Sequence, residues 1–232
     1  MVLFMTDKKA PTSARRAPAG NRNRHATHDR LIAAVGIVLA RGGFSAIGVN
    51  AIADEAGVDK VLIYRYFGGL PELLAAFARS RTFWPPAEEL IEKDIEAFRS
   101  RSLSKRASMV LENYVKAIQV RPLTVEILAW ECVEHNALTR ALADARAVEA
   151  RRVWELAGVH PQDHALLAGL TTLFAAAINY LAIRSRVAKA FNTYDITSDT
   201  LWEQLTGVMT VVCDRTLEPA LAVPHKNTKR TA

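Results

Sequence analysis

Apolar residues recur along this chain at the spacing of a helix surface. In the first such stretch, from about Thr27 to the glycine pair at 42–43, they lie three or four residues apart: Leu31, Ala34, Val35, Val38 and Leu39. Because residues at this spacing share one face of an α-helix, the stretch predicts an amphipathic helix that ends at the two glycines. Two shorter helices are predicted over 49–56 and 60–66, and a fourth begins near Pro71.

The rest of the chain continues in helical segments separated by turn-forming residues. The separators contain proline, glycine or asparagine and lie at 85–86, 122, 158–161 and 192–197. No run alternates apolar and polar residues with period two, and no Asn-Gly or Asp-Gly hairpin signal occurs. The pattern therefore predicts an all-α fold of about nine helices.

Residues 165–183 carry no charged side chain over nineteen positions. That length just reaches the thickness of a bilayer, so a membrane anchor is one interpretation. The stretch is also rich in alanine, contains polar residues such as Thr171 and Asn179, and has no companion span elsewhere in the chain. We favour a helix that is covered on one side by its own domain and on the other by a partner subunit.

Residues 49–66, VNAIADEAGVDKVLIYRY, have the spacing of a helix-turn-helix motif. Ala53 precedes Gly57 by four positions and Ile63 follows it by six, and these are the positions at which two such helices touch. The side chains expected in the three-helix core are Ile52, Val58 and Ile63, together with Val38 and Phe44. Those expected to point outward are Asn50, Lys60, Tyr64 and Arg65. A second helix presented in this way can enter the major groove of DNA.

The stretch from Arg30 to about Leu74 resembles the DNA-binding domain of the TetR family of bacterial transcriptional regulators. The resemblance rests on the AA…L…G pattern of the first helix, the IA…AGV turn and the IYRYF recognition helix, in that order near the N-terminus. It implies phosphate contacts for Asn50, Tyr64 and Tyr66, a phosphate or guanine contact for Lys60, and base or phosphate contacts for Arg65. We expect Leu62 to touch a thymine methyl.

Three positions depart from the family pattern. Leu70 stands where members usually have a lysine, Leu62 where a small or hydroxyl residue is frequent, and Gly48 where threonine is frequent. Each departure removes an expected phosphate contact. The helix-turn-helix domain therefore needs affinity from elsewhere in the chain.

The net charge of +6 is concentrated at the two ends of the chain. Residues 1–30 carry +5 and the last seven carry +3, which leaves −2 for residues 31–225, and the unit 31–69 is neutral. A basic surface on the folded part therefore cannot be inferred from the total. We expect the N-terminal arm to be disordered and to supply DNA-backbone affinity, with a solubilising tail as the alternative.

The expected organisation has four parts. They are a disordered basic arm (1–25), a helix-turn-helix domain (26–70), an effector-binding and dimerisation domain (71–222) and a basic tail (223–232). By the resemblance, helices at about 161–187 and 198–217 form a homodimer through a four-helix bundle. A two-fold dimer implies a palindromic operator on double-stranded DNA.

The resemblance also implies a small-molecule pocket in the larger domain, for a ligand that the sequence does not identify. The candidate lining residues are aromatic or polar: Tyr114, Trp130, Glu134, Trp154, Phe174 and Tyr180, with Glu131 and His135 as further polar candidates.

Sequence signals for catalysis are lacking. Glu131, Glu134 and His135 do not have the Glu-x-x-His spacing of a di-iron bundle, and neither a phosphate-binding glycine-rich loop nor a nucleophile elbow occurs. Cys132 and Cys213 are too distant in sequence for a Cys-based zinc site and fit a reducing cytoplasm. We expect no enzymatic activity, no metal and no cofactor.

These observations predict a cytoplasmic, homodimeric DNA-binding repressor that is released from its operator by a small-molecule ligand and does not associate with membranes. The alternative is a helical small-molecule-binding or membrane-peripheral protein in which the helix-turn-helix is vestigial.

Overall fold

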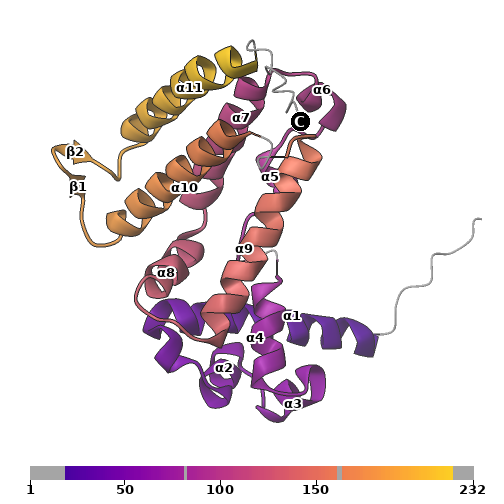
Figure 1. Ribbon diagram of the computed structural model, residues 1–232. Helices are drawn as coiled ribbons and strands as arrows, with labels where there is room; N and C mark the ends of the chain where they lie inside the picture. Colours follow the sequence, from indigo (N-terminus) through magenta and orange to yellow (C-terminus); the bar gives the residue numbers. More distant parts are fainter. Residues whose placement is uncertain (1–18, 81–82, 161–163, 222–232) are drawn as a thin grey trace, which may run out of the picture.

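The computed structural model describes residues 19–80, 83–160 and 164–221, which fold into helices and one short hairpin (Figure 1). The all-α fold class is confirmed. Eleven α-helices occur over these ranges, more than the nine predicted, because the connection that follows residue 83 contains two short ones, α5 (Ala87–Leu90) and α6 (Ile95–Arg99). Residues 1–18 of the predicted arm and the whole predicted tail lie outside the described residues.

Four helices at the bottom of Figure 1 form what we call the head: α1 (Ala19–Gly42), α2 (Val49–Ala56), α3 (Val61–Phe67) and α4 (Leu70–Ala78). A short 3-10 turn, Phe44–Ala46, connects α1 to α2. α1 runs across the head, and both α2 and α4 pack against it.

α1 begins at Ala19, well before the predicted start at Thr27, so residues 19–25 of the predicted disordered arm are helical. Contacts with α3 account for part of this extension. The guanidinium of Arg24 lies 5.6 Å from the centroid of the Tyr66 ring, and the His28 ring stacks on Phe67 at 4.6 Å. These contacts join residues about 40 positions apart in the chain, so local periodicity gives no sign of them.

The head is built around a set of buried residues that we call the head cluster: Leu31, Ala34, Val35, Val38, Leu39, Phe44, Ile52, Ala53, Ala56, Ile63, Leu73, Phe77, Ala78, Phe83, Ile127, Leu138 and Leu142. Four of the five core positions predicted for the helix-turn-helix are among them, and the fifth, Val58, is partly buried against the cluster. The cluster continues past residue 70 through α4 and takes in three residues from α8 and α9. Packing is therefore continuous across the expected domain boundary.

The remaining helices form what we call the body. Its long members are α7 (Leu103–Gln119), α8 (Pro122–Glu131), α9 (Ala137–Leu156), α10 (Ala165–Ser185) and α11 (Asp199–Leu221). α7 lies at the centre and packs against α10 and α11 (Figure 1). Side-chain caps fix two of the helix starts: the Ser102 hydroxyl accepts from the Lys105 amide, and Asn136 and Thr139 form a capping box.

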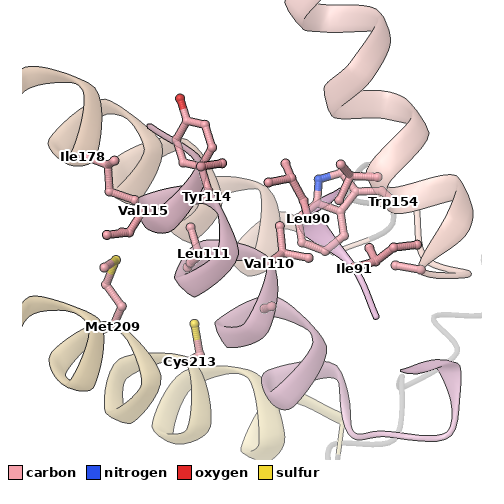
Figure 2. Packing of buried hydrophobic residues seen from close by; sticks show 14 of the residues in the cluster. Leu90, Ile91, Val110, Leu111, Tyr114, Val115, Trp154, Ile178, Met209 and Cys213 are labelled. Carbon is pink, nitrogen blue, oxygen red and sulfur yellow. The ribbon is translucent and has the colours of Figure 1, made fainter. Parts of the chain in front are cut away.

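A second set of buried residues, the body cluster, surrounds α7 and includes Leu90, Ile91, Val110, Leu111, Tyr114, Val115, Trp154, Ile178, Met209 and Cys213. Figure 2 shows Leu111 and Val115 of α7 on the side of Met209 and Cys213 from α11, while Trp154 of α9 lies beside Leu90. In the body, α7 therefore packs against α11 on one side, and on the other side α5 packs against both α7 and α9.

The segment between α10 and α11, predicted only as a turn, contains a two-stranded hairpin. β1 (Ala190–Phe191) pairs antiparallel with β2 (Tyr194–Asp195). Two-residue strands are too short to show an alternating pattern in the sequence. The Phe191 ring meets the ring of Tyr180 edge to face at 5.6 Å, which ties the hairpin to the end of α10.

Candidate DNA-binding surface and ligand cavity

The turn between α2 and α3 is fixed at its first residue, Gly57. This glycine has φ 60°, and its amide donates to the carbonyls of Ala53 and Asp54; a residue with a Cβ would be strained in this left-handed conformation. The Arg30 guanidinium donates to the carbonyls of Ala56 and Gly57, each at 3.1 Å. The turn is therefore attached directly to α1.

α3 has one buried and one exposed face. Ile63 is 0% exposed and packs in the head cluster, whereas Val61 and Tyr64 are 61% and 55% exposed and Arg65 is also exposed. Positions 61, 64 and 65 share a helix face because they are three and four residues apart. Lys60 is exposed at the start of the same helix. We call Lys60, Val61, Tyr64 and Arg65 the outer face of α3.

Two predicted DNA-binding residues lie beside this outer face. Leu62 and Tyr66 are partly buried and pack against the head cluster, and Tyr66 lies under the Arg24 guanidinium. Val61, which sequence reasoning missed, holds the exposed apolar position that was assigned to Leu62. Counting three and four residues back from the outward positions 64 and 65 would have found it.

Asn50 is exposed near the start of α2. The N-cap of α2 is Gly48, so no side chain caps the backbone amides at the start of this helix. Uncapped amides at a helix N-terminus favour a bound anion such as a phosphate. Leu70, where the family usually has a lysine, begins α4 and packs against the head cluster.

The exposed cations of the head differ in their partners. Arg41 pairs with Glu55 at 3.0 Å, whereas Lys60 and Arg65 form no ion pair within the described part of the chain. Unlike Arg41, the two cations on the outer face of α3 therefore have no carboxylate in an ion pair with them.

A cavity of about 500 Å³ lies in the body between α7, α9 and α10. Of the six candidate ligand-binding residues, Tyr114 and Trp154 line it. Phe174, Glu134 and Tyr180 are not among its lining residues; Phe174 packs in part against the body cluster, and Tyr180 is 53% exposed on α10.

Trp130, another candidate, belongs to the junction between body and head. Its indole nitrogen donates to the Ala40 carbonyl at 3.5 Å, and its ring covers Gly43. A Cβ at Gly43, which has φ 69°, would lie 2.7 Å from that ring. Trp130 therefore packs on the end of α1 and does not line the cavity.

The polar groups at the cavity are mostly paired with protein atoms. Tyr114 donates its hydroxyl to Asn179 Oδ1 at 2.6 Å, and burial raises the pKa of Tyr114, so the phenol stays neutral. Arg146 forms an ion pair with Glu131 at 2.7 Å, and Glu149 accepts the Ala87 amide at 2.8 Å. Sequence reasoning named Glu131 as polar but missed its arginine, because the two lie on different helices.

The outward side of α10 is apolar. Leu166, Leu173 and Tyr180 recur every seven residues and are 50%, 64% and 53% exposed, with Gly169 and Ala176 exposed between them. We call these five residues the α10 stripe. By length and composition α10 could also cross a membrane, and little of it is buried inside this chain. On the neighbouring α11, Val208 and Val211 are likewise exposed.

Across the described ranges, no three His, Cys, Asp or Glu side chains gather closely enough to hold a metal ion.

The head matches a known family. The family model described as bacterial regulatory proteins, tetR family, matches residues 31–77, which cover the second half of α1, all of α2 and α3 and nearly all of α4. A comparison with curated proteins finds no match.

Solved structures extend the likeness to the whole fold. A TetR-like transcriptional regulator from Rhodococcus sp. RHA1 is 17% identical with a TM-score of 0.54, over 90% of this chain and 100% of that one. A TetR family transcription regulator from Marinobacter aquaeolei VT8 is 19% identical with a TM-score of 0.59, over 83% and 97%. The regulator FadR from Bacillus subtilis, solved with stearoyl-CoA, is 15% identical with a TM-score of 0.57, over 80% and 97%. At these identities the likeness establishes the fold.

Proposed function

We propose that the chain, which has a TetR-like fold and matches the family model over residues 31–77, is a TetR-family transcriptional regulator. In this proposal it is a cytoplasmic repressor that binds a palindromic operator as a homodimer. A small molecule that enters the body cavity releases it from DNA. The residues that bind DNA are Asn50, Lys60, Val61, Tyr64 and Arg65, with Leu62 and Tyr66 at the margin of the contact.

The observation that carries this proposal is the outer face of α3. Val61, Tyr64 and Arg65 project from a seven-residue helix whose opposite face is anchored by the fully buried Ile63. This combination suits a recognition helix: Arg65 can pair with a guanine edge, Val61 can touch a thymine methyl, and Tyr64 can donate to a phosphate. A solvated helix of no function would have little reason to expose an apolar residue beside an aromatic one.

The α10 stripe supports the dimer. Its seven-residue repeat is the period at which two helices keep contact along their length, and Gly169 and Ala176 allow their backbones to approach closely. The exposed Val208 and Val211 of α11 extend the same apolar surface. In a two-fold dimer each stripe meets its own copy, and the two heads face the same side of the DNA.

A continuous line of aromatic rings supports release by a ligand. Phe77 of α4 contacts Phe83 at 5.8 Å, Phe83 contacts Trp84 at 6.0 Å, and Trp84 contacts Tyr114 at 5.7 Å. Phe77 and Phe83 belong to the head cluster, whereas Trp84 and Tyr114 line the cavity. A ligand that moves Trp84 therefore repacks α4, and it shifts the equilibrium by its different affinity for the two arrangements.

The test is fluorescence anisotropy of labelled DNA taken from upstream of the chain's own gene, with a shuffled fragment of equal length as the control. We expect the dimer to bind the natural fragment at least about 10³-fold more tightly than the shuffled one. Equal affinity for both fragments at low salt, with an intact dimer in light scattering, would refute the proposal.

The apolar α10 also favours one alternative, a membrane-peripheral protein whose helix-turn-helix is vestigial. Flotation with liposomes separates the two functions. A regulator stays in the protein fraction as a dimer, whereas the alternative requires the chain to float with the vesicles.

A further inference from the structure

The charges around the cavity limit what it can bind. We propose that the cavity selects an uncharged, ring-containing molecule and discriminates against anions. The reason is that Arg146, the cation in the cavity lining, is already neutralised by Glu131. This inference rests on the proposed function for its regulatory meaning, but binding to the cavity can be measured without DNA.

The cavity walls are suited to flat apolar rings. Three aromatic residues from separate segments line it, Trp84, Tyr114 and Trp154, and aliphatic side chains such as Val110 and Val153 fill the spaces between them. Figure 2 shows Tyr114 on α7 and Trp154 on α9, with Leu90 and Val110 lying between them. A volume of about 500 Å³ lies in the range of pockets that hold one small ligand.

Arg146 is the cation among the described lining residues, and its charge is already satisfied. Its guanidinium contacts the Glu131 carboxylate at 2.7 Å, and the side chains of Glu131 and Arg146 are only 9% and 22% exposed. The guanidinium also lies 5.5 Å from the Trp84 ring centroid. An anionic ligand would have to compete with a carboxylate that is already in place, and breaking a largely buried ion pair is costly.

The carboxylate that lines the cavity, Glu149, accepts a hydrogen bond from the Ala87 amide. Arg146 and Glu149 are the cation and the anion of the described lining, so its formal charges sum to zero and it offers no excess positive charge to an anion. The phosphates of an acyl-CoA would find no unpaired cation among these residues. Such a ligand is therefore disfavoured here, although a structural relative was solved with stearoyl-CoA.

Neutral hydrogen-bonding groups remain to orient a ligand. The Thr172 hydroxyl and the Asn179 side-chain NH₂ group line the α10 side, together with Thr171, whose hydroxyl donates to the Leu167 carbonyl and can still accept a hydrogen bond. They lie opposite the α9 side, where Arg146 and Trp154 are found. A hydroxyl or carbonyl substituent on one edge of a ring system matches this arrangement, since a few polar groups in an apolar pocket fix orientation.

Two dyes directly test the preference of the cavity for uncharged over anionic ligands, which we call the charge rule. N-phenyl-1-naphthylamine is uncharged, and 8-anilinonaphthalene-1-sulfonate has the same ring system with a sulfonate added. Titrated into the full-length dimer, the neutral dye should bind at least about 10-fold more tightly than the sulfonate. Equal affinities, or tighter binding of the sulfonate, would overturn the proposal.

Paired variants show whether binding occurs in the cavity. Ala147→Trp places a bulky ring among the lining residues and should abolish the fluorescence of the neutral dye. Ala143→Trp lies one turn earlier on α9, is exposed and does not line the cavity, so it should leave binding unchanged. If both variants bind the neutral dye as the parent does, the dye is on another surface and the proposal fails.

A second pair of variants tests the role of Glu131. Glu131→Gln leaves the Arg146 charge without its partner. The ratio of the affinity for the neutral dye to that for the sulfonate should therefore fall about 10-fold or reverse. Glu134→Gln, three residues on and away from the cavity lining, should not change it. The double variant Glu131→Gln/Arg146→Gln, which removes both charges, should regain the neutral preference. An unchanged dye ratio in Glu131→Gln, with folding verified by circular dichroism, contradicts the proposal.

Failure of this inference and failure of the proposed function have different signatures. If the dyes bind as predicted but neither changes DNA affinity, the charge rule holds and ligand release is wrong. If operator binding is specific but the two dyes bind equally, the repressor proposal stands and the charge rule is wrong.

Discussion

The head and the body bury their apolar residues to different extents. In the head, Leu31, Ile52 and Ile63 are completely buried, and the short helices α2 and α3 are closed against α1. In the body, α7 is well covered, but a cavity lies between α9 and α10, and the outward side of α10 stays apolar and exposed. The head is thus complete within one chain, whereas the body has surfaces that suit a ligand and a second copy.

This difference in burial suits the two regions to different functions. A complete head can act as a rigid unit that presents the outer face of α3. The body, which leaves a cavity and an apolar surface open, can change its conformational equilibrium when a ligand or a partner binds. Either one adds contacts that the single chain lacks. The aromatic line through Phe83 and Trp84 is one of the places where the two regions meet.

The largest expected effect comes from the surface that the body leaves uncovered. Leu173→Asp puts a charge in the middle of the α10 stripe and should convert the dimer to monomers in light scattering. Because two linked heads bind far more tightly than one, affinity for the operator should fall about 10²–10⁴-fold. Val148→Asp, at an exposed apolar position on α9 outside the stripe, is the control and should stay dimeric. A dimeric Leu173→Asp would place the dimer interface elsewhere.

Substitutions on the outer face of α3 should weaken DNA binding in two different ways, by loss of base specificity and by a uniform loss of affinity. Arg65→Ala should cost about 1–3 kcal/mol at particular base pairs and relax specificity there. Tyr64→Phe removes only a hydroxyl and should weaken binding to all sequences alike. Selection of bound sequences from a randomised operator library distinguishes the two. If both variants keep the parent's preferences and affinity, α3 does not read the DNA.

A smaller effect tests how the head is closed. Arg30→Met removes the hydrogen bonds to the carbonyls of Ala56 and Gly57 and should lower the free energy of unfolding by about 1–3 kcal/mol. Arg41→Met removes the exposed ion pair with Glu55 and should cost less than about 1 kcal/mol. Urea denaturation compares the two variants. Equal losses would mean that Arg30 does not hold the turn.

The smallest perturbation uses the two cysteines of the body. Burial raises the pKa of Cys213 to about 11, with the nearby Asp214 adding to the rise, so at pH 8 its thiol is protonated and unreactive. Cys132 is exposed. Ellman's reagent should therefore modify Cys132 quickly and Cys213 only as the body unfolds. Two fast thiols in the native protein would show that the body around α11 opens readily.

Local sequence predicts the head well and the body poorly, for a physical reason. The spacing of Ala53, Gly57 and Ile63 predicted the turn because all three positions belong to contacts within fifteen residues. The early start of α1 escaped prediction, since its contacts come from α3.

The cavity depends on longer separations. Tyr114 meets Asn179 from 65 positions away, and Trp84 reaches the cavity from a connection with no periodic pattern. Tyr114 and Trp154 could be proposed as large aromatic residues in a helical domain. Arg146 has no local sequence signal that sets it apart, and its pairing with Glu131 follows from the packing of α8 beside α9.

The most direct test of the account is a hydroxyl-radical footprint of the dimer on DNA from upstream of its own gene. We expect two protected segments of the DNA backbone that are related by two-fold symmetry, with centres about one helical turn or a multiple apart. In Arg65→Ala we expect these two localised segments to be lost. Uniform cleavage at low salt with the parent protein, confirmed as a dimer in light scattering, would contradict the account.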